Sequence, residues 1–223
     1  MENLKPTFGK LLQQNKDEVI TMGSMVEKSL GKAVEALRKR DLAQAHQIIA
    51  DDAKINEKRF YIENQCIELI ANYQPAVSDL QVIVTMLHII TELERIGDYA
   101  EGIAKIVVMI GDEPPLKPLI DIPRMNDITI EMIHNSLAAF IESDSKKAAN
   151  VLSMDDVVDN LYDQVFRELL TFMLSDTKTI SRATRLMWVA HNLERAADRA
   201  TNISERVVHL ITGKIAESGS SKY

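Results

Sequence analysis

Cysteine, glycine, proline and aromatic residues are all scarce in this sequence of 223 residues. Cys66 is the single cysteine, and the chain has 8 glycines, 6 prolines and 5% aromatic residues. A lone cysteine excludes a disulfide framework and is typical of a reducing compartment. Because turn-forming residues and the aromatic residues that strands favour are both few, a β-sandwich or β-barrel is excluded as well. Hydrophobic residues still make up 46% of the chain, which is enough to bury a core.

Positive charge and long apolar runs are lacking too. The formal net charge is −7 at pH 7, which argues against a nucleic-acid partner because nucleic acids bind basic surfaces. The N-terminal sequence lacks the apolar core of a signal peptide. The most apolar stretch, residues 103–110, is far shorter than the roughly 18 to 20 residues of a membrane span. We therefore expect a cytoplasmic protein that meets a membrane only indirectly, through its partners.

The six prolines divide the chain into long segments without helix breakers. Pro6 and Pro75 stand alone, whereas the other four lie within residues 114–123. Because a proline inside a helix costs about 3 kcal/mol, this distribution predicts long helices and one central linker. The expected fold class is all-α, a tandem repeat of two antiparallel three-helix bundles with six helices over residues 7–39, 42–73, 77–110, 123–142, 145–174 and 178–212. The expected domains are residues 1–111 for the first three-helix repeat, 112–123 for a proline-rich linker, 124–213 for the second repeat and 214–223 for a disordered tail.

The two halves resemble each other at a constant offset of 100 residues. The tripeptide Leu-Glu-Arg at residues 93–95 recurs at residues 193–195. Further identical residues follow at the same offset, at positions 98 and 198, 100 and 200, 103 and 203, and 107–108 and 207–208. An internal match at one fixed spacing indicates a duplicated structural unit. We interpret each half as one copy of a three-helix unit.

Acidic residues replace apolar ones along one face of the last helix in each half. In the first half, Glu94, Asp98 and Glu101 continue an apolar stripe at steps of three and four residues, which keeps them on one helix face. In the second half, Glu194 and Asp198 repeat the change. Like charges at this spacing repel each other, so the arrangement has an energetic cost unless a cation lies beside it.

The middle helix of each half contributes further oxygen-bearing side chains. Asp52 and Asn56 lie on or beside its packing seam in the first half, and Asp155 and Asp159 lie on the seam in the second. Because the middle and last helices run antiparallel about a short turn, these residues should lie level with the acidic face of the last helix. Four such side chains in one groove suit hard or borderline cations, and carboxylates accept Mg, Mn, Fe, Zn or Ca. The predicted metal ligands are Asp52, Asn56, Glu94, Asp98, Glu101, Asp155, Asp159, Glu194 and Asp198.

Two alternatives to a regulatory metal site stay open. In one, the acids form a solvated face held by Arg95, Arg195, Arg59 or Arg199, and the chain is a plain helical interaction module. In the other, Glu131 and His134 supply one E-x-x-H, half of the motif of di-iron bundles, and the chain is a carboxylate-bridged metal enzyme or an iron-storage bundle. Phosphate-binding loops, nucleophile elbows and paired cysteines are missing from the sequence, so we expect no enzyme.

The two acidic segments resemble the paired signatures of the PhoU family of phosphate-transport regulators. They read Leu-Glu-Arg-Ile-Gly-Asp-Tyr-Ala at residues 93–100 and Asn-Leu-Glu-Arg-Ala-Ala-Asp-Arg-Ala-Thr-Asn-Ile at residues 192–203, and the resemblance covers the whole chain. It implies two three-helix bundles, a homodimer, and metal clusters held by E(D)-x-x-x-D motifs. The ions implied are divalent or trivalent and can form multinuclear clusters, with iron or zinc favoured and Mg or Mn as alternatives.

The resemblance also implies a function without catalysis. Members of the family act as adaptors that restrain phosphate uptake and the phosphate-starvation response by linking the ATPase of the phosphate ABC transporter to a sensor histidine kinase. The chain departs from the family pattern at Asn56, where an aspartate is expected, and at residues 196–197, where Ala-Ala replaces Ile-Gly. The first departure removes a charge from the first metal site, so we expect the two sites to bind metal unequally.

Overall fold

Six long α-helices and one short 3-10 helix make up nearly all of residues 4–214, the part of the chain that this computed structural model describes. The elements are α1 (Leu4–Lys39), α2 (Leu42–Tyr73), α3 (Val77–Ile110), α4 (Asp121–Glu142), α5 (Ser145–Ser175), η1 (Thr177–Thr179) and α6 (Ile180–Thr212). No strand occurs within residues 4–214. The expected all-α fold with six helices is therefore confirmed, and each helix begins and ends within a few residues of its expected bounds.

The helix ends follow local chemistry, and two of them extend beyond the expected start. Helices α1 and α4 begin two residues before Pro6 and Pro123, because proline is tolerated in the first turn, where its missing N–H would be unpaired anyway. Asp41 caps α2, and its side chain accepts a hydrogen bond from the Gln44 backbone N–H at 2.9 Å. Gly213 follows α6 with a φ of 69°, the left-handed conformation that commonly ends a helix.

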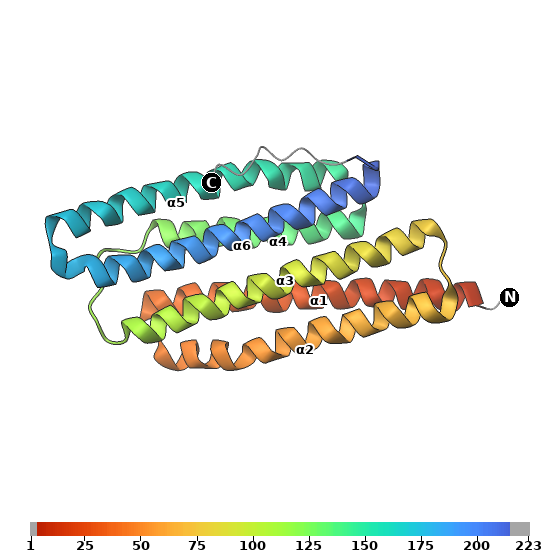
Figure 1. Ribbon diagram of the computed structural model, residues 1–223, viewed down its shortest axis with the longest axis horizontal. Coiled ribbons are helices and arrows are strands. Elements are labelled where there is room, and N and C mark those ends of the chain that lie inside the picture. The colour runs from red at the N-terminus through yellow and green to blue at the C-terminus, as the bar shows by residue number, and fades with distance from the viewer. Residues whose placement is uncertain (1–3, 215–223) are drawn as a thin grey trace.

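The three helices of each half pack against one another, and the two halves pack together through α3 against α6 and α1 against α4. In Figure 1 the first half, coloured red to yellow-green, lies below the second half, coloured green to blue, with all helices along the long axis. The buried apolar residues of both halves form one continuous hydrophobic cluster. In α3 they recur at steps of three and four residues, as the sequence predicts: Met86, Ile89, Leu93, Ile96, Ala100, Ile103 and Val107.

Helices α3 and α6 run in opposite directions, and their contact is nearly symmetric. Glu92 of α3 accepts a hydrogen bond from the Asn202 side chain of α6, and further along α3 Gly102 lies against Asn192. At the 100-residue offset, Glu92 corresponds to Asn192 and Gly102 to Asn202. Exchanging the two halves therefore maps one contact onto the other, so the halves are related by an internal two-fold axis.

Three other expectations from the sequence concern membrane spans, the domain division and the C-terminal tail. None of the helices within residues 4–214 is long and apolar enough to cross a membrane. The division of the chain into two domains with a linker over residues 112–123 stays a prediction. Apart from Lys214, the tail expected over residues 214–223 lies outside the described residues.

The α1–α4 contact depends on a glycine, which gives a first prediction. A Cβ atom at Gly23 of α1 would lie 2.2 Å from Cδ1 of Leu137 in α4, and Leu137 is itself buried. Gly23→Ala should therefore lower the free energy of unfolding by about 1 kcal/mol, because the leucine must move inside a packed core. The matched control is Gly31→Ala in the same helix, whose Cβ would make an ordinary contact of 3.5 Å with Ile130.

Urea denaturation of both variants measures the difference. Gly31→Ala should raise the free energy of unfolding by about 0.5 to 1 kcal/mol, because alanine restricts the unfolded chain and favours helix. Equal stabilisation by both substitutions would show that the α1–α4 contact accommodates a larger residue at Gly23.

Candidate metal centres

The predicted ligands form two clusters, one in each half. The first acidic cluster consists of Asp52 and Asn56 on α2 with Glu94, Asp98 and Glu101 on α3; the second acidic cluster consists of Asp155 and Asp159 on α5 with Glu194 and Asp198 on α6. In both clusters the ligands lie in the middle of long helices that pack antiparallel. Their positions are therefore set by the same steps of three and four residues that bury the core.

The four carboxylates of the second acidic cluster lie close enough to affect one another's ionisation. Burial raises the pKa of Glu194 to about 7, and the negative charges of Asp198, Asp159 and Asp155 add to the shift. Burial also raises the pKa of Asp155 to about 6, with further contributions from Asp159 and Asp198. Like charges and lost hydration both disfavour the ionised form of a carboxyl group. These shifts therefore show that the carboxylates of α5 and α6 are crowded together, as the antiparallel arrangement about a short turn predicts.

Several oxygen atoms in or beside the second acidic cluster are buried without a hydrogen-bond partner of good geometry. They are Oδ1 of Asp155, Oε2 of Glu194 and the hydroxyl oxygen of Thr201. Thr201 lies close enough to Asp155 for its hydroxyl to lower the pKa of that carboxyl, although the two do not meet in good hydrogen-bond geometry, and it occupies the position that corresponds to Glu101 of the first half. A buried acceptor left unpaired costs about 1 to 3 kcal/mol. As metal ligands, these oxygens are of the kind that a hard cation prefers.

Two neighbours of the second acidic cluster carry nitrogen atoms. Nη1 of Arg195 donates to Oδ2 of Asp198 at 2.7 Å. Nδ1 of His191 lies 3.5 Å from Oε2 of Glu194, and the centroid of its ring lies 6.1 Å from that of Tyr162. Burial and the charge of Arg195 lower the pKa of His191. The imidazole therefore adds no stable positive charge beside Glu194 at neutral pH.

The first acidic cluster is brought together in the same way. Burial raises the pKa of Asp98, and Asp52, Glu94 and Glu101 raise it further. Burial and the charge of Glu101 likewise raise the pKa of Asp52. The cross-helix pairing inferred from the sequence is thus present in this half too.

The first acidic cluster differs from the second because nitrogen donors of the chain bind three of its members. Nδ2 of Asn56 donates to Oδ2 of Asp52 at 3.0 Å, Nη1 of Arg59 donates to Oε1 of Glu94 at 3.1 Å, and Nζ of Lys105 donates to Oε2 of Glu101 at 2.6 Å. Sequence reasoning missed Lys105, although its spacing of four residues from Glu101 is typical of a helical ion pair. The Arg59 and Arg195 contacts are those that the plain interaction module predicts.

The fit to a metal ion is therefore better in the second half. Among residues 4–214, no group of three or more His, Cys, Asp or Glu side chains is arranged to hold a metal ion as it stands. A cation at the second acidic cluster would need its carboxylates to turn toward one point. The unpaired oxygens of Asp155 and Glu194 favour such a change, although a cation that binds Asp198 would have to displace Arg195. In the first acidic cluster a cation would have to displace both Arg59 and Lys105.

The residues of the alternative enzyme site lie elsewhere. His134 of α4 has an exposed side chain, and its Nδ1 lies 3.6 Å from Oε1 of Glu27 on α1. Glu131 is exposed on α4. The contact that the structure gives His134 is thus with α1 and not with a member of either acidic cluster. Cys66 is fully buried, and burial raises the pKa of its thiol to about 11, as befits an inert core residue.

Comparison with known proteins gives consistent matches over most of the chain. The PhoU domain family model matches residues 19–107 and again residues 122–207. A phosphate-specific transport system accessory protein PhoU homolog of Aquifex aeolicus is 41% identical over 93% of this chain and 94% of its own length. The accessory protein PhoU of Escherichia coli is 31% identical over 96% of this chain and 88% of its own length.

Solved structures agree with the sequence matches. The crystal structure of PhoU from Pseudomonas aeruginosa superposes with a TM-score of 0.88 at 33% identity, covering 93% of this chain and all of that one. The phosphate transport system regulatory protein PhoU from Streptococcus pneumoniae gives a TM-score of 0.87 at 30% identity, covering 94% and 99% of the two chains.

Replacing Glu194 tests the electrostatic cost of the second acidic cluster. Because its pKa is raised from 4.5 to about 7 in the folded protein, its contribution to stability is fully present below pH 4.5 and is lost as the pH rises through about 7. We compare the free energy of unfolding of chelator-treated Glu194→Gln with that of the unaltered chain. The difference should shift by about 1 kcal/mol in favour of the variant when the pH is raised from 5 to 8. This value is below full linkage because the carboxyl is partly solvated.

Urea denaturation at the two pH values measures the gain, and Glu131→Gln is the matched control. Glu131 is an exposed helical glutamate outside both clusters, so its substitution should change stability equally at pH 5 and pH 8. A pH-independent effect of Glu194→Gln would contradict the crowding of the four carboxylates.

Proposed function

This chain belongs to the PhoU family, and on that premise we propose that it is a non-catalytic accessory protein of a phosphate transport system. Two repeats of the family domain span both halves of the chain. Relatives that carry the name of such an accessory protein match at 31% to 41% identity over most of its length. The family resemblance noted in the two acidic segments is thereby confirmed. Family proteins carry names of accessory and regulatory proteins rather than of enzymes, which supports a role without catalysis.

We propose further that the chain is a cytoplasmic negative regulator that couples the ATPase of the phosphate ABC transporter to a sensor histidine kinase. An adaptor of this kind needs two separate contact surfaces. Val77, at the start of α3, is 72% exposed, and Leu174, near the end of α5, is 86% exposed. The α2–α3 turn and the α5–α6 turn lie at opposite ends of the molecule (Figure 1). These two apolar tips favour simultaneous contact with two proteins, and homodimer formation would double the number of tips.

The observation that carries a metal-dependent version of this function is the pair of unpaired buried oxygens in the second acidic cluster, Oδ1 of Asp155 and Oε2 of Glu194. We propose that Asp155, Asp159, Glu194 and Asp198 hold divalent or trivalent ions, with iron or zinc favoured. Bound metal would supply positive charge that neutralises the carboxylates and fixes α5 against α6. The first acidic cluster is expected to bind more weakly, because Asn56, Arg59 and Lys105 already bind its members.

Metal content of protein purified without chelator tests this assignment. Asp155→Asn should lose at least about half of the bound metal, since it removes a charged ligand from the stronger cluster. The matched control is Asp156→Asn, which makes the same change at an exposed position one residue along the same helix. Elemental analysis of both variants beside the unaltered chain gives the answer. Equal metal in all three proteins, or metal that is lost only with Glu94→Gln, would contradict the assignment.

The regulatory role is tested by gene deletion in the organism that encodes the chain. Deletion should derepress phosphate-starvation genes in phosphate-rich medium, because the proposed brake on the kinase is removed. Deleting the sensor kinase as well should return expression to the repressed level, and a reporter fusion measures each strain. Normal repression in the single deletion would contradict the regulatory role. Derepression that persists without the kinase would contradict the coupling alone.

A further inference from the structure

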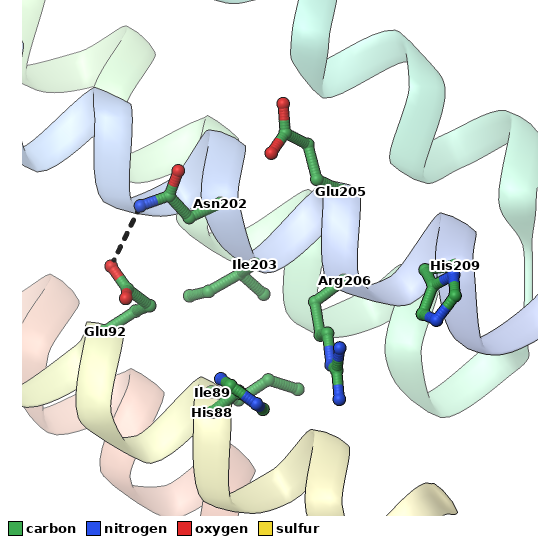
Figure 2. A pocket seen from close by; sticks show the side chains of 8 residues that line it. All are labelled: His88, Ile89, Glu92, Asn202, Ile203, Glu205, Arg206 and His209. Atoms are coloured by element: carbon green, nitrogen blue, oxygen red, sulfur yellow. Dashed lines mark hydrogen bonds between the residues drawn. The ribbon is translucent and has the colours of Figure 1, made fainter. Parts of the chain in front are cut away.

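An open cavity of about 370 Å³ with both polar and apolar walls lies between α3 and α6, on one side of the interface between the halves. We call it the α3–α6 cavity. Its polar lining consists of His88 and Glu92 from α3 and of Asn202, Glu205, Arg206 and His209 from α6 (Figure 2). None of the predicted metal ligands lines it. Neither acidic cluster therefore explains its polarity.

The α3–α6 cavity presents a guanidinium group that has unused hydrogen-bonding capacity. Figure 2 shows the Arg206 side chain extending from α6 toward α3, into the space that His88 also faces. Nε of Arg206 is buried and has no hydrogen-bond partner among residues 4–214. The charge of Arg206, together with burial, lowers the pKa of His88, which shows that the two groups lie close together. A buried guanidinium N–H without an acceptor is costly, so the cavity favours an occupant that supplies one.

The two carboxylates of the lining do not supply that acceptor. Glu92 accepts hydrogen bonds from Nη1 of Arg199 at 3.3 Å and from Nδ2 of Asn202 at 3.2 Å. Figure 2 shows the Glu205 side chain directed away from Arg206 and His88. Because Glu92 is engaged by Arg199 and Asn202 and Glu205 points away, the part of the cavity around Arg206 presents N–H donors without a facing carboxylate, which suits an anion.

The internal two-fold axis shows that packing alone does not require this polar lining. At the 100-residue offset, His88, Arg206 and His209 correspond to Trp188, Ile106 and Met109. The opposite side of the same helix pair thus carries apolar residues at all three places, of which Ile106 is buried and Trp188 and Met109 are exposed. Because the two sides share one backbone arrangement, the arginine and the histidines point to a ligand rather than to a demand of the α3–α6 contact.

We propose that the α3–α6 cavity binds a small tetrahedral oxyanion of the phosphate class, with Arg206 as its principal ligand and His88 and His209 as further donors. The planar guanidinium donates two parallel hydrogen bonds to two oxygens of such an anion, a geometry that lysine does not match. A neutral imidazole adds one N–H donor, and a protonated one adds two. Free inorganic phosphate and the phosphoryl group of a phosphorylated protein share this chemistry. The proposal is independent of metal at the acidic clusters.

Isothermal titration calorimetry at low ionic strength tests the site. The chain is first treated with chelator, so that metal at the acidic clusters cannot bind the anion, and is then titrated with inorganic phosphate and with phosphoserine. Arg206→Gln should weaken binding by about tenfold or more, the loss expected for one charge-assisted hydrogen bond. Arg167→Gln, at an exposed arginine of α5, should leave binding unchanged. The double variant His88→Asn/His209→Asn changes only exposed positions and should weaken binding by a few-fold.

Each result bears on the proposal in one direction. Tighter binding of phosphoserine would assign the ligand to a phosphorylated protein, and tighter binding of phosphate would assign it to the free ion; both support the site. Binding of equal strength in Arg206→Gln, with unaltered circular dichroism, would overturn it. So would the absence of heat for both compounds up to about 20 mM, a concentration that already corresponds to very weak affinity. Zinc binding that depends on the two histidines and ignores Arg206→Gln would also overturn it, by showing a cation site.

Discussion

The antiparallel packing of α3 on α6 is the contact on which the rest of this structure depends. It joins two three-helix halves into one continuous hydrophobic cluster, and it relates them by an internal two-fold axis. Each of these helices also supplies the acidic face of its own half. The core stripes that hold α3 and α6 in place therefore fix the positions of both acidic clusters. The α3–α6 cavity lies on one side of this same contact, where His88, Arg206 and His209 stand at positions that are apolar in the other half.

Carboxylates placed beside a packed core are costly, and the two halves deal with that cost differently. The first half supplies its own nitrogen donors, since Asn56, Arg59 and Lys105 bind the acids around them. The second half leaves Asp155 and Glu194 with unpaired oxygens, and their pKa values rise to about 6 and about 7. The stability of a long helical core supports such local strain, which makes the second half the better place for an exchangeable cation. Duplication has thus produced two similar scaffolds with different electrostatic states.

Much of the fold could be predicted because its signals are local. Proline positions and capping residues such as Asp41 set the helix bounds, and apolar residues at steps of three and four residues predict the buried faces. The gathering of Asp155 with Glu194 was also predictable, since a short turn between antiparallel helices leaves little freedom in their register. The predicted starts of α1 and α4 were a few residues too late. Proline disrupts a helix in its interior but is accepted in the first turn, so both helices begin two residues before Pro6 and Pro123.

The sequence by itself determined the helical fold, the duplication, the family and the membership of both acidic clusters, because each of these depends on spacing within one or two helices. Only the tertiary structure decided how the halves face each other, which acids keep unpaired oxygens, and that His88 and Arg206 line one cavity. Those features depend on contacts between side chains, most of them on different helices, where small differences in side-chain direction decide which partner is reached. Helical periodicity predicts on which face of its helix each residue lies, but only the packing of α3 against α6 determines which residues of the other helix that face contacts.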